Sequence, residues 1–199
     1  GQLQAVGLGV ADPELGPPRH DPARARQLLA EAGWGQGFRL TLSGPNDRYV
    51  NDDRIIQAIA QYWERIGVRM RVEAMPSNVF FPRSAQRAFS AAMTGWQSSA
   101  FEPNNIFAPM LLTEDRAHGW GTVTRHGYSN PRLDEIYPRA VVNPNQAERI
   151  VLWREMMRIA MEDEAVMPIH HQVNIWATRR GLTYRPRSDE YTLTTSLGV

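Results

Sequence analysis

The spacing of apolar side chains between residues 21 and 96 switches repeatedly between the repeat of helices and the two-residue repeat of strands. Asp21 and Pro22 suit the N-cap and first position of a helix, and Gly33 and Gly67 suit positions just after a helix. The pattern predicts helices over 21–33, 52–66 and 77–88 and strands over 38–42, 68–72 and 89–93. Because strands joined by helices usually pair in parallel, we expect an α/β fold.

The second half of the chain is richer in helical spacing. It predicts helices over 104–112, 131–140 and 144–161, with an irregular stretch over 113–130. The run from Val166 to His171 predicts a buried strand, which 174–178 continues or pairs with. Prolines, glycines and threonines near both ends predict extended segments there.

Composition narrows the classes of protein. Of 199 residues, 42% are hydrophobic and 22% charged, as in globular proteins. The net charge of +1 gives no field that would attract nucleic acid or an anionic membrane. The absence of cysteine excludes disulfides and a thiol nucleophile. The chain begins without Met or a signal peptide, so we expect it to be part of a longer protein.

One polar segment follows a predicted central strand directly. It begins at Gly95 and Trp96 and continues through Ser98 and Ser99 to Asn105. A second loop, with Asn46 and Arg48, leaves the same end of another strand. Ligands in open α/β sheets bind at the carboxyl ends of strands, so we expect the two loops to converge on a ligand. The alternative is a packed tryptophan followed by a polar turn.

Other candidate sites have ordinary explanations. His170 and His171 are adjacent in a predicted strand, so they point to opposite faces and cannot bind one metal together. The acidic run 162–164 is most simply a solvated helix end. A hydrolase using His170 or His171 with Glu164 lacks a supporting spacing. We therefore predict no catalytic residue, no metal site and no cofactor.

Several motifs, in order, resemble one family. Residues 21–34, DPARARQLLAEAGW, are similar to its "DPxxAxxLLxEAGW" helix, and 127–134, GYSNPRLD, to its "GYSNPxxD". Met93 to Trp96 matches a strand that ends in Gly-Trp. The family is the dipeptide, oligopeptide and nickel class of extracellular solute-binding proteins, family 5, the receptors of ABC importers. The resemblance covers about 5 to 195.

The resemblance implies a receptor of two lobes that enclose a small polar or peptide-like solute. This chain would be the second, C-terminal lobe of such a type II binding protein, with a mixed sheet flanked by helices. It implies a hinge or connector over 1–20, the solute-binding lobe over 21–180, and a segment over 181–199 that returns to the first lobe. It also implies an exported, periplasmic or lipid-anchored protein, not an enzyme, that works with membrane permease subunits and its own N-terminal lobe.

The resemblance also places the site residues. Trp96 falls on a tryptophan that lines the cleft in many members, and Ser99 stands where peptide-binding members often carry an Asp that pairs with the peptide's amino group. Glu102 could take that role if its loop turns inward. The predicted ligand-binding residues are Trp96, Ser98, Ser99, Glu102, Asn46 and Arg48. Because Ser99 replaces the Asp, the ligand itself is left open. A second role for such a lobe, ligand sensing in a regulator or signalling protein, is also left open, because a signal peptide or a helix-turn-helix upstream would distinguish the two roles.

Overall fold

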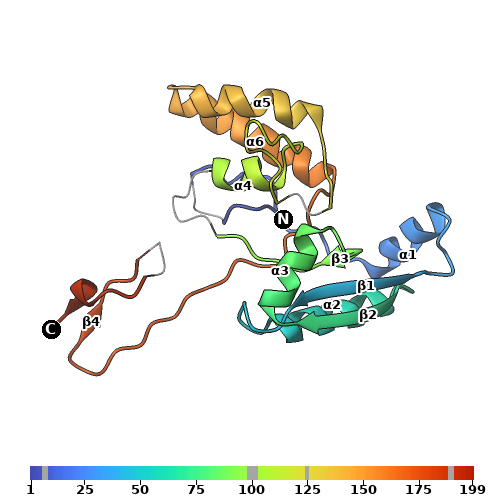
Figure 1. The fold of residues 1–199 in the computed structure, drawn as a ribbon, viewed down its shortest axis with the longest axis horizontal. Coiled ribbons are helices and arrows are strands. Elements are labelled where there is room, and N and C mark those ends of the chain that lie inside the picture. The colour runs from blue at the N-terminus through green and yellow to red at the C-terminus, as the bar shows by residue number, and fades with distance from the viewer. Residues whose placement is uncertain (6–8, 98–102, 124–125, 188–190) are drawn as a thin grey trace. The chain divides into compact units, whose positions relative to one another are not determined.

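The computed structural model describes residues 1–5, 9–97, 103–123, 126–187 and 191–199 (Figure 1). The chain forms two compact units. Unit 1 contains Gly1–Gly16, Gln97–Ala108 and Pro131–Val199, and unit 2 contains Pro17–Trp96 and Pro109–Asn130.

Unit 2 is built on a parallel sheet in the order β2-β1-β3. Its elements are α1 (Pro22–Glu31), β1 (Arg39–Pro45), α2 (Asp52–Glu64), β2 (Arg69–Met75), α3 (Ser77–Ala85) and β3 (Ala91–Ala92). Figure 1 shows β1 and β2 side by side, with α2 against them. The predicted order of helices and strands and their parallel pairing are confirmed.

The core of unit 2 lies between α2 and the sheet. Leu42 of β1, Ile56 of α2 and Met93 after β3 are buried together, with Tyr49 and Ile59 packed against them. The apolar stripe predicted for α2 therefore covers the sheet, as an amphipathic helix does. The first helix differs from α2. Helix α1 begins with the predicted Asp21 cap, but none of its residues is buried, and Leu28 is exposed.

Unit 1 is mainly helical. The helices α5 (Pro131–Val142) and α6 (Gln146–Glu162) pack against each other, and α4 (Asn104–Met110) crosses the boundary between the units at Pro109. The ring of Trp153 stacks on Phe107 with centroids 5.6 Å apart and meets Tyr137 edge-on. Such pairs stabilise a core beyond the area that they bury.

The N-terminal segment of unit 1 is anchored by polar contacts. The buried carboxylate of Asp12 forms an ion pair with Arg158 of α6, with Oδ2 and Nε 2.7 Å apart. The side-chain amide of Gln2 donates a hydrogen bond to the carbonyl of Asp12 and accepts one from the N–H of Asp12, each at 2.8 Å. Residues 1–5 and 9–16 contain no helix or strand, but they are fixed to α6.

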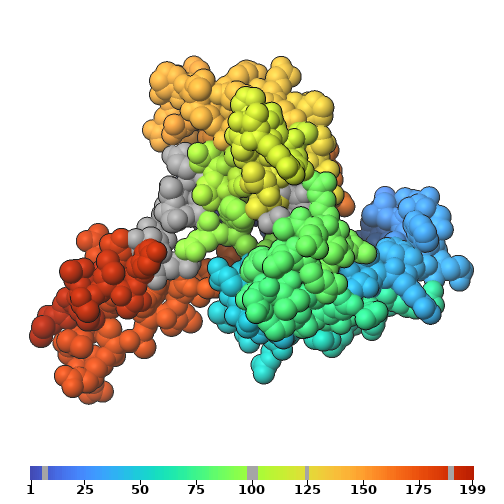
Figure 2. All heavy atoms as spheres, viewed as in Figure 1, coloured from blue at the N-terminus to red at the C-terminus, as the bar shows by residue number. Residues whose placement is uncertain are grey.

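The strand predicted from Val166 to His171 is wrong. Residues 167–179 form neither helix nor strand, and Figure 1 shows a long stretch of chain leading to the hairpin of β4 (Thr183–Tyr184) and β5 (Leu197–Gly198). Backbone N–H and C=O groups need a neighbouring strand to form a sheet. No described residue pairs with this segment, so its strand-type alternation has no sheet to join. The hairpin and η1 (Thr194–Ser196) gather in a small cluster, red in Figure 2.

The end of α6 carries a strained residue. Glu164 lies in the left-handed region at φ 51°, where its N–H bonds to Met161 and the next N–H, of Ala165, bonds to Ala160. This is a Schellman motif, whose left-handed position favours glycine, and an acidic side chain there also opposes the helix dipole. The predicted solvated helix end is therefore confirmed, with a local cost.

Replacing Glu164 with glycine is expected to stabilise the chain by about 1 kcal/mol, because glycine adopts the left-handed conformation without steric cost. The measurement is the free energy of unfolding in urea. Glu162→Gly is the matched control, since Glu162 is the last residue of α6 and glycine there costs about 1 kcal/mol of helix propensity. A loss of stability in Glu164→Gly would contradict the strain argument.

Candidate functional site

The carboxyl ends of the three parallel strands lie at one edge of the sheet in unit 2. The loop after β1 starts at Asn46, whose N–H bonds to the carbonyl of Met75 at the end of β2 (3.0 Å). Asp47 accepts a hydrogen bond from the N–H of Ser77 at the start of α3 (2.7 Å). The loop is thus fixed to both β2 and α3, and it cannot swing away from the sheet edge without breaking these bonds.

A buried carboxylate shapes the rest of this loop. Asp52, the first residue of α2, accepts hydrogen bonds at Oδ2 from the N–H groups of Arg48 (2.9 Å) and Tyr49 (3.0 Å). Its Oδ1 accepts from the N–H of Asp53 (2.9 Å). Burial alone would raise the pKa of Asp52, but these backbone hydrogen bonds outweigh it and hold the pKa below its ordinary value. Asp52 therefore stays charged and keeps the loop folded around it.

Tyr49 joins this loop to the segment that follows β3. Its hydroxyl lies 3.2 Å from the carbonyl oxygen of Gly95 and 3.3 Å from the hydroxyl oxygen of Thr94. The guanidinium of Arg48 lies over the Tyr49 ring, 5.1 Å from its centroid, in a cation–π contact. The predicted convergence of the two loops is therefore present in the structure.

The predicted ligand-binding residues divide into two groups. Trp96, Asn46 and Arg48 lie on the converging segments and are exposed, with Trp96 at 44%. Ser98, Ser99 and Glu102 lie outside the described residues. That these side chains bind a ligand stays a prediction.

Sequence reasoning missed Tyr49, Thr94 and Asp52. The available signal was Asp52 itself, because an Asp at the first turn of a helix often accepts hydrogen bonds from nearby N–H groups. Nothing in the spacing revealed that Tyr49 would reach Gly95, since the two are 46 positions apart and meet only when β1 and β3 pair.

Alternative sites have little support. The described residues hold no cluster of three or more side chains that could bind a metal, and none of their helices is both long and apolar enough to cross a membrane. His118 pairs with Asp115, with Nδ1 2.7 Å from Oδ2. His170 and His171 are exposed in the segment before the hairpin.

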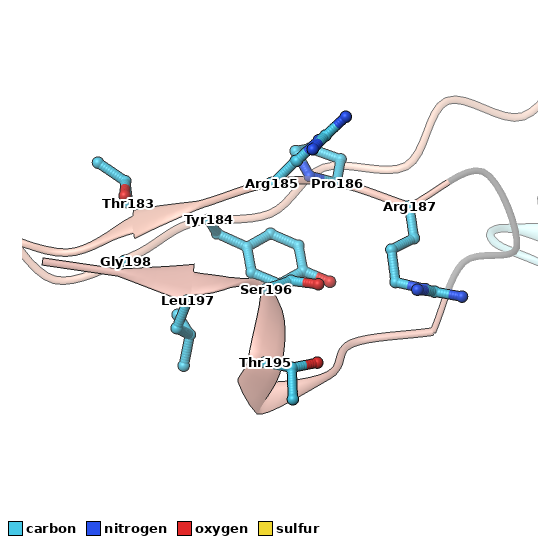
Figure 3. A pocket seen from close by; sticks show the side chains of 9 residues that line it. All are labelled: Thr183, Tyr184, Arg185, Pro186, Arg187, Thr195, Ser196, Leu197 and Gly198. Atoms are coloured by element: carbon cyan, nitrogen blue, oxygen red, sulfur yellow. The ribbon is translucent and has the colours of Figure 1, made fainter.

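Two surface hollows contain none of the predicted residues. One is formed by the β4–β5 hairpin of unit 1, where Figure 3 shows the side chains of Arg185 and Arg187 pointing in different directions. The other, in unit 2, lies between the end of α3 and the turn after Leu112, and there Arg87 and Arg116 both pair with Glu114.

The chain matches a known family of binding proteins over more than half of its length. Residues 4–117 match the family model described as bacterial extracellular solute-binding proteins, family 5, middle part. The chain belongs to this family. Members of family 5 are binding proteins and not enzymes, and their extracellular character places the protein in the periplasm or outside the cell.

Two curated relatives are similar to this chain in sequence. The chain is 25% identical over 162 residues to heme-binding protein A of Haemophilus influenzae, covering 77% of this chain and 28% of that protein. It is 26% identical over 188 residues to the glutathione-binding protein GsiB of Salmonella typhimurium, covering 88% and 36%. The chain thus spans about a third of the length of these relatives.

Solved structures show the family 5 fold. HbpA2 from Haemophilus parasuis superposes with a TM-score of 0.81 at 19% identity, covering 95% of this chain and 37% of that chain. The periplasmic binding protein DppA from Helicobacter pylori, solved with the peptide STSA, superposes with a TM-score of 0.74 at 19% identity, covering 82% and 31%. The predicted α/β fold of a periplasmic binding protein is confirmed.

Proposed function

We propose that the chain is the second lobe of a two-lobed receptor of an ABC importer, which encloses a small polar or peptide-like solute. The observation that carries the proposal is the convergence of the Arg48–Tyr49 loop and the Thr94–Trp96 segment at the carboxyl ends of parallel strands, in a member of family 5. Solute sites in open α/β folds are built at such edges.

The exposed segment before the C-terminal hairpin supports the proposal that this chain packs against another lobe of the same protein. Its alternate side chains Met167, Ile169, Val173 and Ile175 are exposed by 68%, 49%, 80% and 88%. The segment is neither helix nor strand, and exposed apolar side chains gathered in one stretch normally have a partner. We propose that the first lobe covers it, with residues 1–20 as the connector and 181–199 returning toward that lobe.

The exposed groups at the site suit a solute that carries an oxyanion and an apolar or planar part. The Arg48 guanidinium makes no ion pair with any described residue and is held by the Tyr49 ring, so its fork is free to accept a carboxylate. Trp96 offers an indole for stacking, and Asn46 an amide. Glutathione and peptides, which appear in the names of relatives and solved complexes, carry such groups.

The test uses the complete receptor, with this chain joined to the rest of its protein. Calorimetric titration with glutathione, with di- and tripeptides and with heme is expected to give saturable one-to-one binding of at least one of them. Small-angle scattering is expected to show compaction on binding, as for hinge closure. No binding of any of these solutes at millimolar concentration would contradict the proposed solute class.

A further inference from the structure

We propose that Tyr49 is a positioning residue, whose hydroxyl sets the path of the Trp96 segment as it leaves β3. The inference deepens the proposed function, and only its consequence for solute affinity rests on that function. The geometric part concerns unit 2 alone.

The hydroxyl of Tyr49 is placed between two groups of the opposite segment. One phenolic O–H donates to the carbonyl of Gly95 at 3.2 Å, and the same oxygen can accept from the Thr94 hydroxyl at 3.3 Å. Gly95 directly precedes Trp96, and Thr94 precedes Gly95. The bond to Gly95 therefore restrains the backbone next to the indole directly, and the bond to Thr94 restrains it through a side chain.

Gly95 fits this arrangement because it has no side chain. A Cβ at this position would lie 2.7 Å from Cε1 and 3.1 Å from Cζ of the Tyr49 ring. The φ of Gly95 is not positive, so the backbone conformation does not itself require glycine. The nearness of the Tyr49 ring is what excludes a side chain.

Tyr49 is itself held from three directions. Its N–H bonds to the buried Asp52, its ring lies under the Arg48 guanidinium, and it packs against the core cluster of Leu42, Ile56 and Met93. A side chain that is fixed to a helix start and to the core can impose its position on a neighbouring loop. The contacts thus connect Asp52 to Tyr49 and Tyr49 to Gly95, the residue directly before Trp96.

The test follows the Trp96 indole without any ligand. The chain has six tryptophans, so labelling with 5-fluorotryptophan gives six fluorine resonances, and Trp96→Phe identifies the one of Trp96. In Tyr49→Phe, which keeps the ring and removes the hydroxyl, the Trp96 resonance is expected to shift or broaden while the other five stay in place. Tyr62→Phe is the matched control, because Tyr62 is an exposed tyrosine of α2 that lies under Arg65.

A Trp96 resonance unchanged in Tyr49→Phe would overturn the inference. Movement of all six resonances would overturn it too, because it would show a general structural role. Gly95→Ala is expected to displace the Trp96 resonance when Tyr49 is present and to do so much less in a Tyr49→Ser background. Equal displacement in both backgrounds would show that the ring does not exclude the side chain.

The last measurement separates this inference from the proposed function. In the complete receptor, Tyr49→Phe is expected to weaken binding of the solute found by titration about two- to tenfold, the scale of one hydrogen bond. A displaced Trp96 with unchanged affinity would support the positioning role and contradict the binding role of Trp96. An undisplaced Trp96 would overturn the positioning role whatever the affinity.

Discussion

Replacing Asp52 with alanine is expected to lower the free energy of unfolding by about 2–3 kcal/mol. The carboxylate accepts hydrogen bonds from the N–H groups of Arg48, Tyr49 and Asp53, and alanine would leave these donors without acceptors. Buried donors that lose a charged acceptor cost about 1–3 kcal/mol, and water can reach part of this loop. Urea unfolding followed by circular dichroism measures the loss.

Asp53→Ala is the matched control, because Asp53 is the next residue of α2 and is exposed. It is expected to change the free energy of unfolding by less than about 0.5 kcal/mol, as surface substitutions usually do. Equal losses in the two variants would show that the hydrogen bonds to Asp52 are not what stabilises the loop.

The effect of Asp52 depends on pH in a definite direction. The pKa of Asp52 is lower in the folded chain than its ordinary value of 3.8, so its charged form stabilises the fold above that pH. This stabilisation is lost as the pH falls through the lowered pKa. The difference in unfolding free energy between the unmodified chain and Asp52→Asn is therefore expected to be constant above about pH 5 and to shrink below about pH 4.

Replacing Trp96 with alanine in the complete receptor is expected to weaken solute binding by about 1–3 kcal/mol, or roughly 5- to 150-fold. Trp96 is 44% exposed at the converging loops, and a bound solute would cover the rest of the ring. Calorimetric titration with the solute found for the unmodified receptor measures the change. Its enthalpy and stoichiometry show whether the remaining site is intact.

Trp34→Ala serves as the control for this substitution. Trp34 is also an exposed tryptophan of unit 2, at 54%, but it contacts Phe38 before β1, at the opposite end of that strand from Asn46. Its replacement is expected to leave affinity unchanged. Equal weakening by the two substitutions, or an unchanged affinity in Trp96→Ala, would remove Trp96 from the site.

The third strand of the sheet is shorter than the sequence predicts. Spacing predicts a strand over 89–93, whereas β3 contains only Ala91 and Ala92. Its position was predictable because the run from Phe89 to Met93 ends directly at the polar segment that begins with Gly95 and Trp96. Its length was not, since it depends on how many residues pair with β1, and only Ala91 and Ala92 do so, opposite Leu42 and Ser43.

The candidate site shows the same division. Asn46, Arg48 and Trp96 could be named from the sequence because parallel pairing brings the carboxyl ends of strands to one edge. The contact between Tyr49 and Gly95 could not, because it depends on the distance between a ring and a backbone in neighbouring loops. Ser98, Ser99 and Glu102 lie outside the described residues and remain predictions.

The sequence by itself determined the family, the α/β order of unit 2 and the helices of the second half, because periodicity and capping act over a few neighbouring residues. Only the tertiary structure decided that 166–171 is not a strand here, that α1 leaves Leu28 exposed and that Tyr49 fixes the segment before Trp96. The physical reason is that burial and pairing need partners distant in the chain. An apolar pattern indicates that a residue will be buried against a partner, but it does not indicate which residue that partner is.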